Sequence, residues 1–481
     1  MATRCQGRVF SRRENFAGKG QTQEESGMEN SYLVLVAIAG VAGVIVAVTR
    51  LRLHPFVALL SAAISVGLAA GMAPADVIEA ITNGMGGTLG FVAVVVGLGS
   101  MFGMLLEESG GMSQLAATLV ARLGEARTGL ALALVGFLIC IPVFLDVALV
   151  MILPLAVATA RRTGRSVTTY ALPMLVGMAV THTFVPPTPG PTAVAQLLAA
   201  DLGWVIALGI ATGLPTLAIT AWFSSTVLAR QAAGKPPLTR STPAVDASPQ
   251  PTLKQPSVSL VLCLLFLPIV LIVGDTVLRT TLGSDAPLTY WTGLVGHPFT
   301  ALLIATLTSF WLLGTRLGMP AARVQQVAER GLEPAGVILL VTGAGGVFKQ
   351  VLIDSGAGAV VASALSELAL PTLIVAWLVA AVIRLLQGSA TVAMITAAGL
   401  VAPLVQTSGQ PEPFAALVTL AIAAGATIAS HVNDSGFWLV GRFLGLTTGE
   451  TLRTWTVLET IISVLGLVFI LTAQGLLGLL L

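Results

Sequence analysis

Arg384 is the residue whose setting says most about chemistry in this chain. It lies inside the apolar stretch "AWLVAAVIRLLQGSATVAM" (376–394), where a charged side chain is costly and marks a functional site by default. A guanidinium group binds a carboxylate through two parallel hydrogen bonds. We therefore predict that Arg384 binds the carboxylate of a small substrate. The alternative is a structural ion pair, for which Asp434 is the candidate partner.

Small polar residues that could bind a hydroxylated substrate gather in three short motifs. These are "QGSAT" (387–391), "THTFVPPTPGPT" (181–192) and "SHVNDSG" (430–436). A glycine at the first motif allows close backbone approach, and hydroxyl and amide groups pair with sugar hydroxyls. The alternative for each Ser or Thr is a bond to its own helix. The predicted substrate-binding residues are Arg384, Gln387, Gly388, Ser389, Thr391, Thr181, His182, Thr188, Pro189, Gly190, Ser430, His431, Asn433 and Ser435.

Four titratable residues are candidates for moving a proton: Asp434, His182 and His431 in these motifs, and Asp146 in the apolar stretch 129–160. Burial disfavours the charged form of an acid, and histidine titrates nearest to neutral pH. The alternatives are that Arg384 holds Asp434 in its ionised form, and that each histidine is a hydrogen-bonded structural residue.

No metal site, cofactor or enzyme activity is expected. The three cysteines, Cys5, Cys140 and Cys263, lie far apart, and no spacing such as H-E-x-x-H is present. The glycines within 84–103 and 343–346 lack the strand–turn–helix setting of a nucleotide loop. They are predicted to serve close helix packing instead.

The composition indicates a membrane protein. Of 481 residues, 55% are hydrophobic and 10% are charged, whereas soluble domains carry roughly 25% charged residues. The net charge of +2 is too small and too dispersed to indicate nucleic acid as a partner. Residues 1–30 are polar and lack the apolar core of a secretory signal. They are predicted to be a disordered tail, with Met28 as an alternative translation start.

Eight apolar stretches are long enough to be simple membrane spans, since a span needs about 20 residues. Arg50 and Arg52 place the first loop in the cytoplasm, and the same rule places the linker 230–257 there. The eight predicted spans are 31–49, 55–72, 88–106, 204–228, 258–278, 298–314, 335–352 and 457–480.

Two further apolar stretches, 129–160 and 371–405, are too long for one span. The first contains Pro142 and Asp146 and has basic flanks, which indicates that both of its ends are cytoplasmic. The flanks of the second contain no Lys or Arg. We therefore predict two re-entrant hairpins that enter the membrane from opposite sides.

The two halves of the chain resemble each other. "GMGGTLGFVAVVVGLGSMFGMLLEESGG" (84–111) aligns with "GLEPAGVILLVTGAGGVFKQVLIDSGAG" (331–358), and His182 aligns with His431. Together with the opposite hairpins, this predicts inverted repeats, in which helices broken at midplane form the binding site. The expected fold is an all-α integral membrane protein with about ten spans plus two hairpins. Its expected parts are a first repeat 31–229 with hairpin 129–160 and broken helix 170–200, and a second repeat 258–481 with hairpin 371–405 and broken helix 414–445.

At "FVPPTPGPTA" (184–193), "QGSATVAMITAAG" (387–399) and "SHVNDSGFWL" (430–439), the sequence resembles the gluconate permease family of proton symporters. The resemblance extends from about residue 31 to the end. It implies proton-coupled uptake of gluconate or a related sugar acid, with D-serine as the alternative substrate. It also implies an elevator-type homodimer in the bacterial cytoplasmic (inner) membrane. Relatives tend to have Glu and His where this chain has Asp146 and Thr188.

Two other classes of function are less consistent with the sequence. An intramembrane enzyme would need an activated nucleophile or a metal set, and a channel would need a continuous polar path or rings of charge. We therefore expect the partners to be a small carboxylate, a proton and the lipid bilayer.

Overall fold

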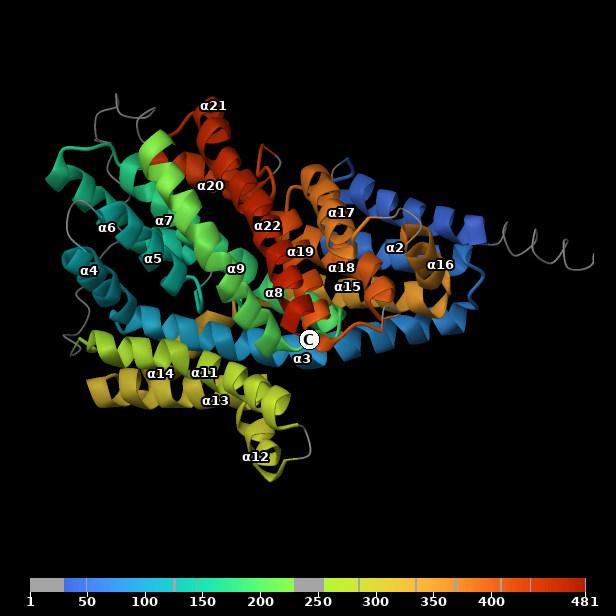
Figure 1. Cartoon of the computed structure of the whole chain (residues 1–481), viewed down its shortest axis with the longest axis horizontal. Coiled ribbons are helices and arrows are strands. Elements are labelled where there is room, and N and C mark those ends of the chain that lie inside the picture. The colour runs from blue at the N-terminus through green and yellow to red at the C-terminus, as the bar shows by residue number, and fades with distance from the viewer. Residues whose placement is uncertain are drawn as a thin grey trace, which may run out of the picture.

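The computed structural model describes residues 30–48, 50–123, 127–143, 145–228, 255–283, 286–333, 335–366, 370–406, 409–432 and 434–480. Every regular element in these ranges is a helix (Figure 1). Seven helices are long and apolar enough to cross a membrane, which confirms the class of all-helical membrane protein. Nearly all of the predicted tail 1–30 and most of the linker 230–257 lie outside the described residues.

In Figure 1, the helix α3 (Pro74–Glu108) runs across the molecule, with α11 to α14 below it. Its 35 residues correspond to about 52 Å at 1.5 Å per residue. The predicted span 88–106 therefore began too late. The reason is that the proline at position 74 starts a helix that continues without a break through the small residues of "NGMGG".

Close contacts between glycines join α3 to α15 (Ala335–Asp354). A Cβ atom on Gly84 would lie 2.6 Å from the carbonyl oxygen of Gly346, so a side chain there has no room. Gly84 and Gly346 thus have the packing role that the sequence predicts, whereas nothing lies within 4 Å of a Cβ atom on Gly86 or Gly87.

Each of the two overlong apolar stretches consists of two helices joined by a short turn. The first contains α5 (Thr128–Ile139) and α6 (Leu145–Thr163), and the second contains α17 (Thr372–Gln387) and α18 (Ala390–Gln406). In the second, Gly388 turns the chain with a φ of 84°, which glycine adopts without strain.

Two helices are interrupted near the motifs singled out above. In the first, α7 (Thr168–Phe184) and α8 (Pro189–Leu197) flank a break at 185–188; in the second, α19 (Glu412–Thr427) and α20 (Ser435–Leu444) flank a longer break at 428–434. Proline-rich sequence explains the first break, because proline cannot donate the helical hydrogen bond.

The order of these helices recurs along the chain. The helix α4 begins at Gly111 and α16 begins at Ala357, 246 residues later; α7 begins at Thr168 and α19 at Glu412, 244 residues later. With the spacing of 244 residues between α7 and α19, the residue equivalent to His182 is Ala426. The alignment of His182 with His431 is therefore wrong. His182 lies inside a helix, whereas His431 lies in the longer second break.

The remaining helices surround these elements. In Figure 1, α11, α12, α13 and α14 form a layer on one side of α3, while α4 to α7 gather at one end of the molecule and α15 to α18 at the other. The remaining helices are Asn30–Val48, α2 (Pro55–Ala69), α4 (Gly111–Leu123), α9 (Leu202–Phe223), α11 (Val258–Leu282), α12 (Pro287–Val295), α13 (Pro298–Ser309), α14 (Ala321–Leu332), α16 (Ala357–Ser366), α21 (Thr448–Thr451) and α22 (Val457–Leu480).

Candidate substrate site

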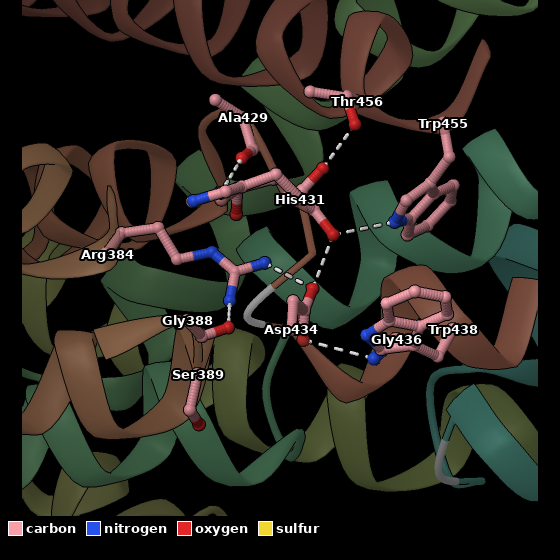
Figure 2. Close-up of polar contacts among 12 residues, drawn as sticks. Arg384, Gly388, Ser389, Ala429, His431, Asp434, Gly436, Trp438, Trp455 and Thr456 are labelled. Carbon is pink, nitrogen blue, oxygen red and sulfur yellow. Dashed lines mark hydrogen bonds and ion pairs between the residues drawn. The ribbon is translucent and has the colours of Figure 1, made fainter. Parts of the chain in front are cut away.

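Arg384 lies in the last turn of α17, directly before the turn at Gly388, and its residue surface is only 2% exposed. Its Nη1 donates to the carbonyl oxygen of Gly388, and its Nη2 lies 2.6 Å from Oδ2 of Asp434 (Figure 2). The structure therefore contains the ion pair with Asp434 that was the alternative at the sequence level. It also places the guanidinium group at the turn between α17 and α18.

Asp434 joins the second break to α20. Its Oδ1 accepts a hydrogen bond from the backbone N–H of Gly436 at 3.0 Å, which caps the helix. Its Oδ2 accepts from Arg384 and from the hydroxyl of Ser430 (Figure 2). Three hydrogen-bond donors therefore surround this one carboxylate.

Ser430 connects this ion pair to the start of α22. The indole N–H of Trp455 donates to the Ser430 hydroxyl at 2.8 Å, and the Thr456 hydroxyl donates to the Ser430 carbonyl (Figure 2). His431 lies beside them, with Nδ1 2.9 Å from the carbonyl oxygen of Ala429. Sequence reasoning missed Trp455 and Thr456, because the last span was predicted to begin only at residue 457.

Several buried polar atoms at the tip between α17 and α18 have no hydrogen-bond partner among the described residues. They are Nε of Arg384 and both side-chain polar atoms of Gln387, which is 6% exposed. Unpaired buried polar groups are costly. Ser389 accepts from the N–H of Val392 at 3.4 Å, and Thr391 is half-buried. The orphan atoms therefore mark this tip as a place where a polar ligand would be stabilised.

The first break uses its hydroxyl groups differently. Thr181 donates to the carbonyl of Phe137 in α5 at 2.7 Å, and Thr188 donates to the carbonyl of Val185 at 2.8 Å. Pro189 begins α8, and a Cβ on Gly190 would meet the sulfur of Met394 at 2.6 Å. The two threonines thus stabilise the backbone of the break, and Gly190 allows α8 to approach α18.

A small, partly open pocket lies beside this first break. His182, Thr188 and Pro189 line it together with Ser100 of α3 and the turn at 141–143. The predicted residues His182, Thr188 and Pro189 therefore face one shared space. The side chain of Asp146, which lies just beyond this turn, and Asn433 as a whole are outside what the structure describes.

The two broken helices touch where they are interrupted. The hydroxyl groups of Thr183 and Thr427 are 2.8 Å apart, and each residue lies in the last turn before a break. Further on, α8 packs against both α18 and α19. The first break is thereby joined to helices from the second half of the chain.

Two of the predicted site residues contribute less to this network. Ser435 begins α20 with an exposed side chain, and His431 is half-buried. In the ranges that the structure describes, no group of three His, Cys, Asp or Glu residues could hold a metal ion.

Interrupted helices around buried polar groups define the class of membrane transport protein, in which irregular backbone is tolerated only beside protein or a water-filled cavity. The solved structure of the Alcanivorax borkumensis YdaH transporter, described as having an unusual topology, has this fold. It matches with a TM-score of 0.62 at 17% identity, over 88% of this chain and 98% of that one.

Residues 32–476 match the model of the GntP family permeases, so the chain belongs to that family and is a permease. It is 40% identical to the low-affinity gluconate transporter of Escherichia coli K12, over 90% of this chain and 96% of that protein. It is 39% identical to the inner membrane permease YgbN of the same organism, over 91% of this chain and 98% of the relative.

Proposed function

We propose that this permease is a proton-coupled symporter that carries gluconate or a related sugar acid into the cell across the inner membrane. The observation that carries this proposal is the buried Arg384 at the tip of α17, beside the unpaired amide of Gln387. The names of the E. coli relatives support the substrate class and the location.

The proposed architecture consists of two inverted repeats with re-entrant hairpins. The recurrence of helices at intervals of 244 to 246 residues supports two repeats. The basic flanks of the first hairpin, and the absence of Lys and Arg from the flanks of the second, support the inversion. The hairpins and broken helices move as a unit against a scaffold that includes α2 and α13. Substrate is thus exposed alternately to each side, in a carrier that works as a homodimer.

The carboxylate of the substrate competes with Asp434 for Arg384. The guanidinium group has five donors, of which the described contacts use Nη1 and Nη2 while Nε has no partner. An arriving carboxylate can therefore pair with the unpaired Nε–H of the guanidinium or displace Asp434, while Gln387, Ser389 and Thr391 bind hydroxyl groups.

A proton accompanies the anion because the site is buried. Arg384 and Asp434 balance each other's charge, so an added carboxylate brings a further negative charge into surroundings of low polarity, where it is costly. Protonation of one ionised acid of the site keeps its net charge unchanged. One proton per anion follows, and an inward proton gradient then drives uptake.

The test is uptake of labelled gluconate into proteoliposomes by the native chain, Arg384→Gln, Asp434→Asn and the double variant. If Arg384 binds the substrate, the double variant stays inactive although its charges are again balanced. Recovery of uptake in the double variant would instead assign the pair a structural role.

D-serine remains the second candidate substrate, because of the acid beside Arg384. A zwitterionic amino acid presents a carboxylate and an ammonium group, which match Arg384 and Asp434 respectively. Competition by unlabelled D-serine for gluconate uptake distinguishes the two. A sugar acid carrier predicts no competition, whereas strong competition would favour the amino acid.

A further inference from the structure

Glu459 is a buried acid that the mechanism above does not use. It lies in the first turn of α22, where its residue surface is 6% exposed. A carboxylate in an apolar membrane interior is costly when ionised, and such residues mark ion or proton pathways.

The contacts at the start of α22 place Glu459 near Arg384. Trp455, in the π-helical turn Leu452–Thr456 that leads into α22, Glu459 and Ser463 are spaced four residues apart and lie along one side of this continuous helix. Trp455 bonds to Ser430, the partner of Asp434, and Ser463 accepts a hydrogen bond at 3.0 Å from the indole of Trp377. Trp377 and Arg384 lie two turns apart on α17. Glu459 therefore lies between two contacts that join α22 to the Arg384 network.

The electrostatic surroundings of Glu459 consist of the same ion pair. Among the described residues, the charges of Arg384 and Asp434 act on its carboxyl group. The helices α9 and α19, which pack against α22, have no charged residue within 202–223 and 413–427. The other titratable or charged residues on elements in contact with α22 are Tyr170 and His182 of α7, Glu412 at the start of α19, and Arg453 beside Thr454.

We propose that Glu459 is the proton-carrying residue of the transporter, and that its ionised form competes with the substrate carboxylate for the positive charge of Arg384. Asp434 is held by three donors as a fixed counter-ion, so Glu459 is the acid free to change its protonation state. In the empty site Glu459 is ionised, and in the occupied site Glu459 is protonated while the substrate anion is bound. The net charge of the site is the same in these two states. This inference rests on the proposed symport and assigns its proton to a residue.

The experiment measures gluconate binding as a function of pH for the native chain and Glu459→Gln. For the native chain, the dissociation constant is expected to rise about tenfold per pH unit above the titration of Glu459, since one proton is bound with each anion. Glu459→Gln mimics the protonated form and is expected to bind with an affinity independent of pH. In proteoliposomes it is expected to exchange gluconate but not to accumulate it against a gradient.

Three controls make the outcomes distinct. Glu459→Asp keeps an acid and should keep the pH dependence, while the exposed Glu412→Gln on α19 should behave like the native chain. A Glu459→Gln variant that still accumulates gluconate with the native pH profile would overturn the assignment. If Glu459→Gln fails to fold, loss of the pH dependence in Glu459→Asp overturns it equally. Absence of gluconate binding by the native chain would instead reject the proposed function itself.

Discussion

At the scale of residues, the account depends on how the buried charges around Arg384 are balanced. Arg384 and Asp434 form an ion pair with almost no solvent contact. Removing one partner of a buried pair leaves an uncompensated charge, whereas removing both leaves none. The pair therefore makes separate predictions for stability and for transport.

We expect Asp434→Asn to lower the free energy of unfolding by about 3–5 kcal/mol, and Arg384→Gln/Asp434→Asn to recover most of that loss. Thermal unfolding of the purified variants in detergent measures this. A double variant less stable than either single variant would contradict the charge argument.

For Gln387 we expect a substitution to weaken binding without lowering stability, because its side chain has no partner among the described residues. Gln387→Leu should leave thermal stability unchanged or raise it, since a buried unpaired amide is removed. Gluconate binding should weaken about tenfold, the equivalent of one lost hydrogen bond of about 1.4 kcal/mol. The exposed Gln325→Leu on α14 is the control. A large loss of stability without a change in affinity would assign Gln387 to the fold rather than to the site.

At the scale of elements, close contacts between helices hold the site in place. The long helix α3 packs against α15 through glycines, and α8 approaches α18 through Gly190. Backbones that lie this close cannot accept a side chain without moving.

Two glycines of α3 provide a matched test. In Gly84→Ala the new methyl group would lie 2.6 Å from a backbone oxygen of α15, whereas at Gly86 nothing lies within 4 Å. We expect Gly84→Ala to lower the unfolding temperature and impair transport. Gly86→Ala should be neutral or stabilising by about 0.5–1 kcal/mol, since alanine favours a helix. Equal unfolding temperatures in the two variants would show that α3 and α15 are not packed this closely.

At the scale of the whole molecule, inverted repeats require the outer ends of the two helical hairpins to lie on opposite sides of the membrane. Cysteines placed singly at the exposed positions Pro371 and Arg165, in a chain without its native cysteines, test this with a membrane-impermeant thiol reagent. We expect Pro371→Cys to react from outside and Arg165→Cys from the cytoplasm, as seen with intact cells and inverted vesicles. Reaction of both from one side would contradict the inverted arrangement.

The sequence is a good guide to the breaks and to Arg384, because proline, glycine and a charge among apolar residues have strong local consequences. Thus the helix is interrupted within the motif at 181–192, and the chain of the stretch 371–405 turns at Gly388. Contacts between distant segments could not be predicted in this way. Trp455 joins Ser430 only through packing of the chain, and nothing in the local pattern indicates it.

Glu459 and the two histidines show two further limits of prediction from the sequence. Glu459 follows the same rule as Arg384, but it lies at the start of a strongly apolar span whose average hides one acid. The alignment of the two histidines is wrong because His182 lies inside α7, before the first break, whereas His431 lies within the second break. An alignment by residue type cannot distinguish a helical position from a break.

The most direct test of the central claim is accumulation of labelled gluconate by the native chain in proteoliposomes with an imposed inward proton gradient. The account predicts an internal gluconate concentration well above the external one, and collapse to equality when an uncoupler removes the gradient. Uptake that stops at equal concentrations and ignores the uncoupler would contradict proton-coupled transport.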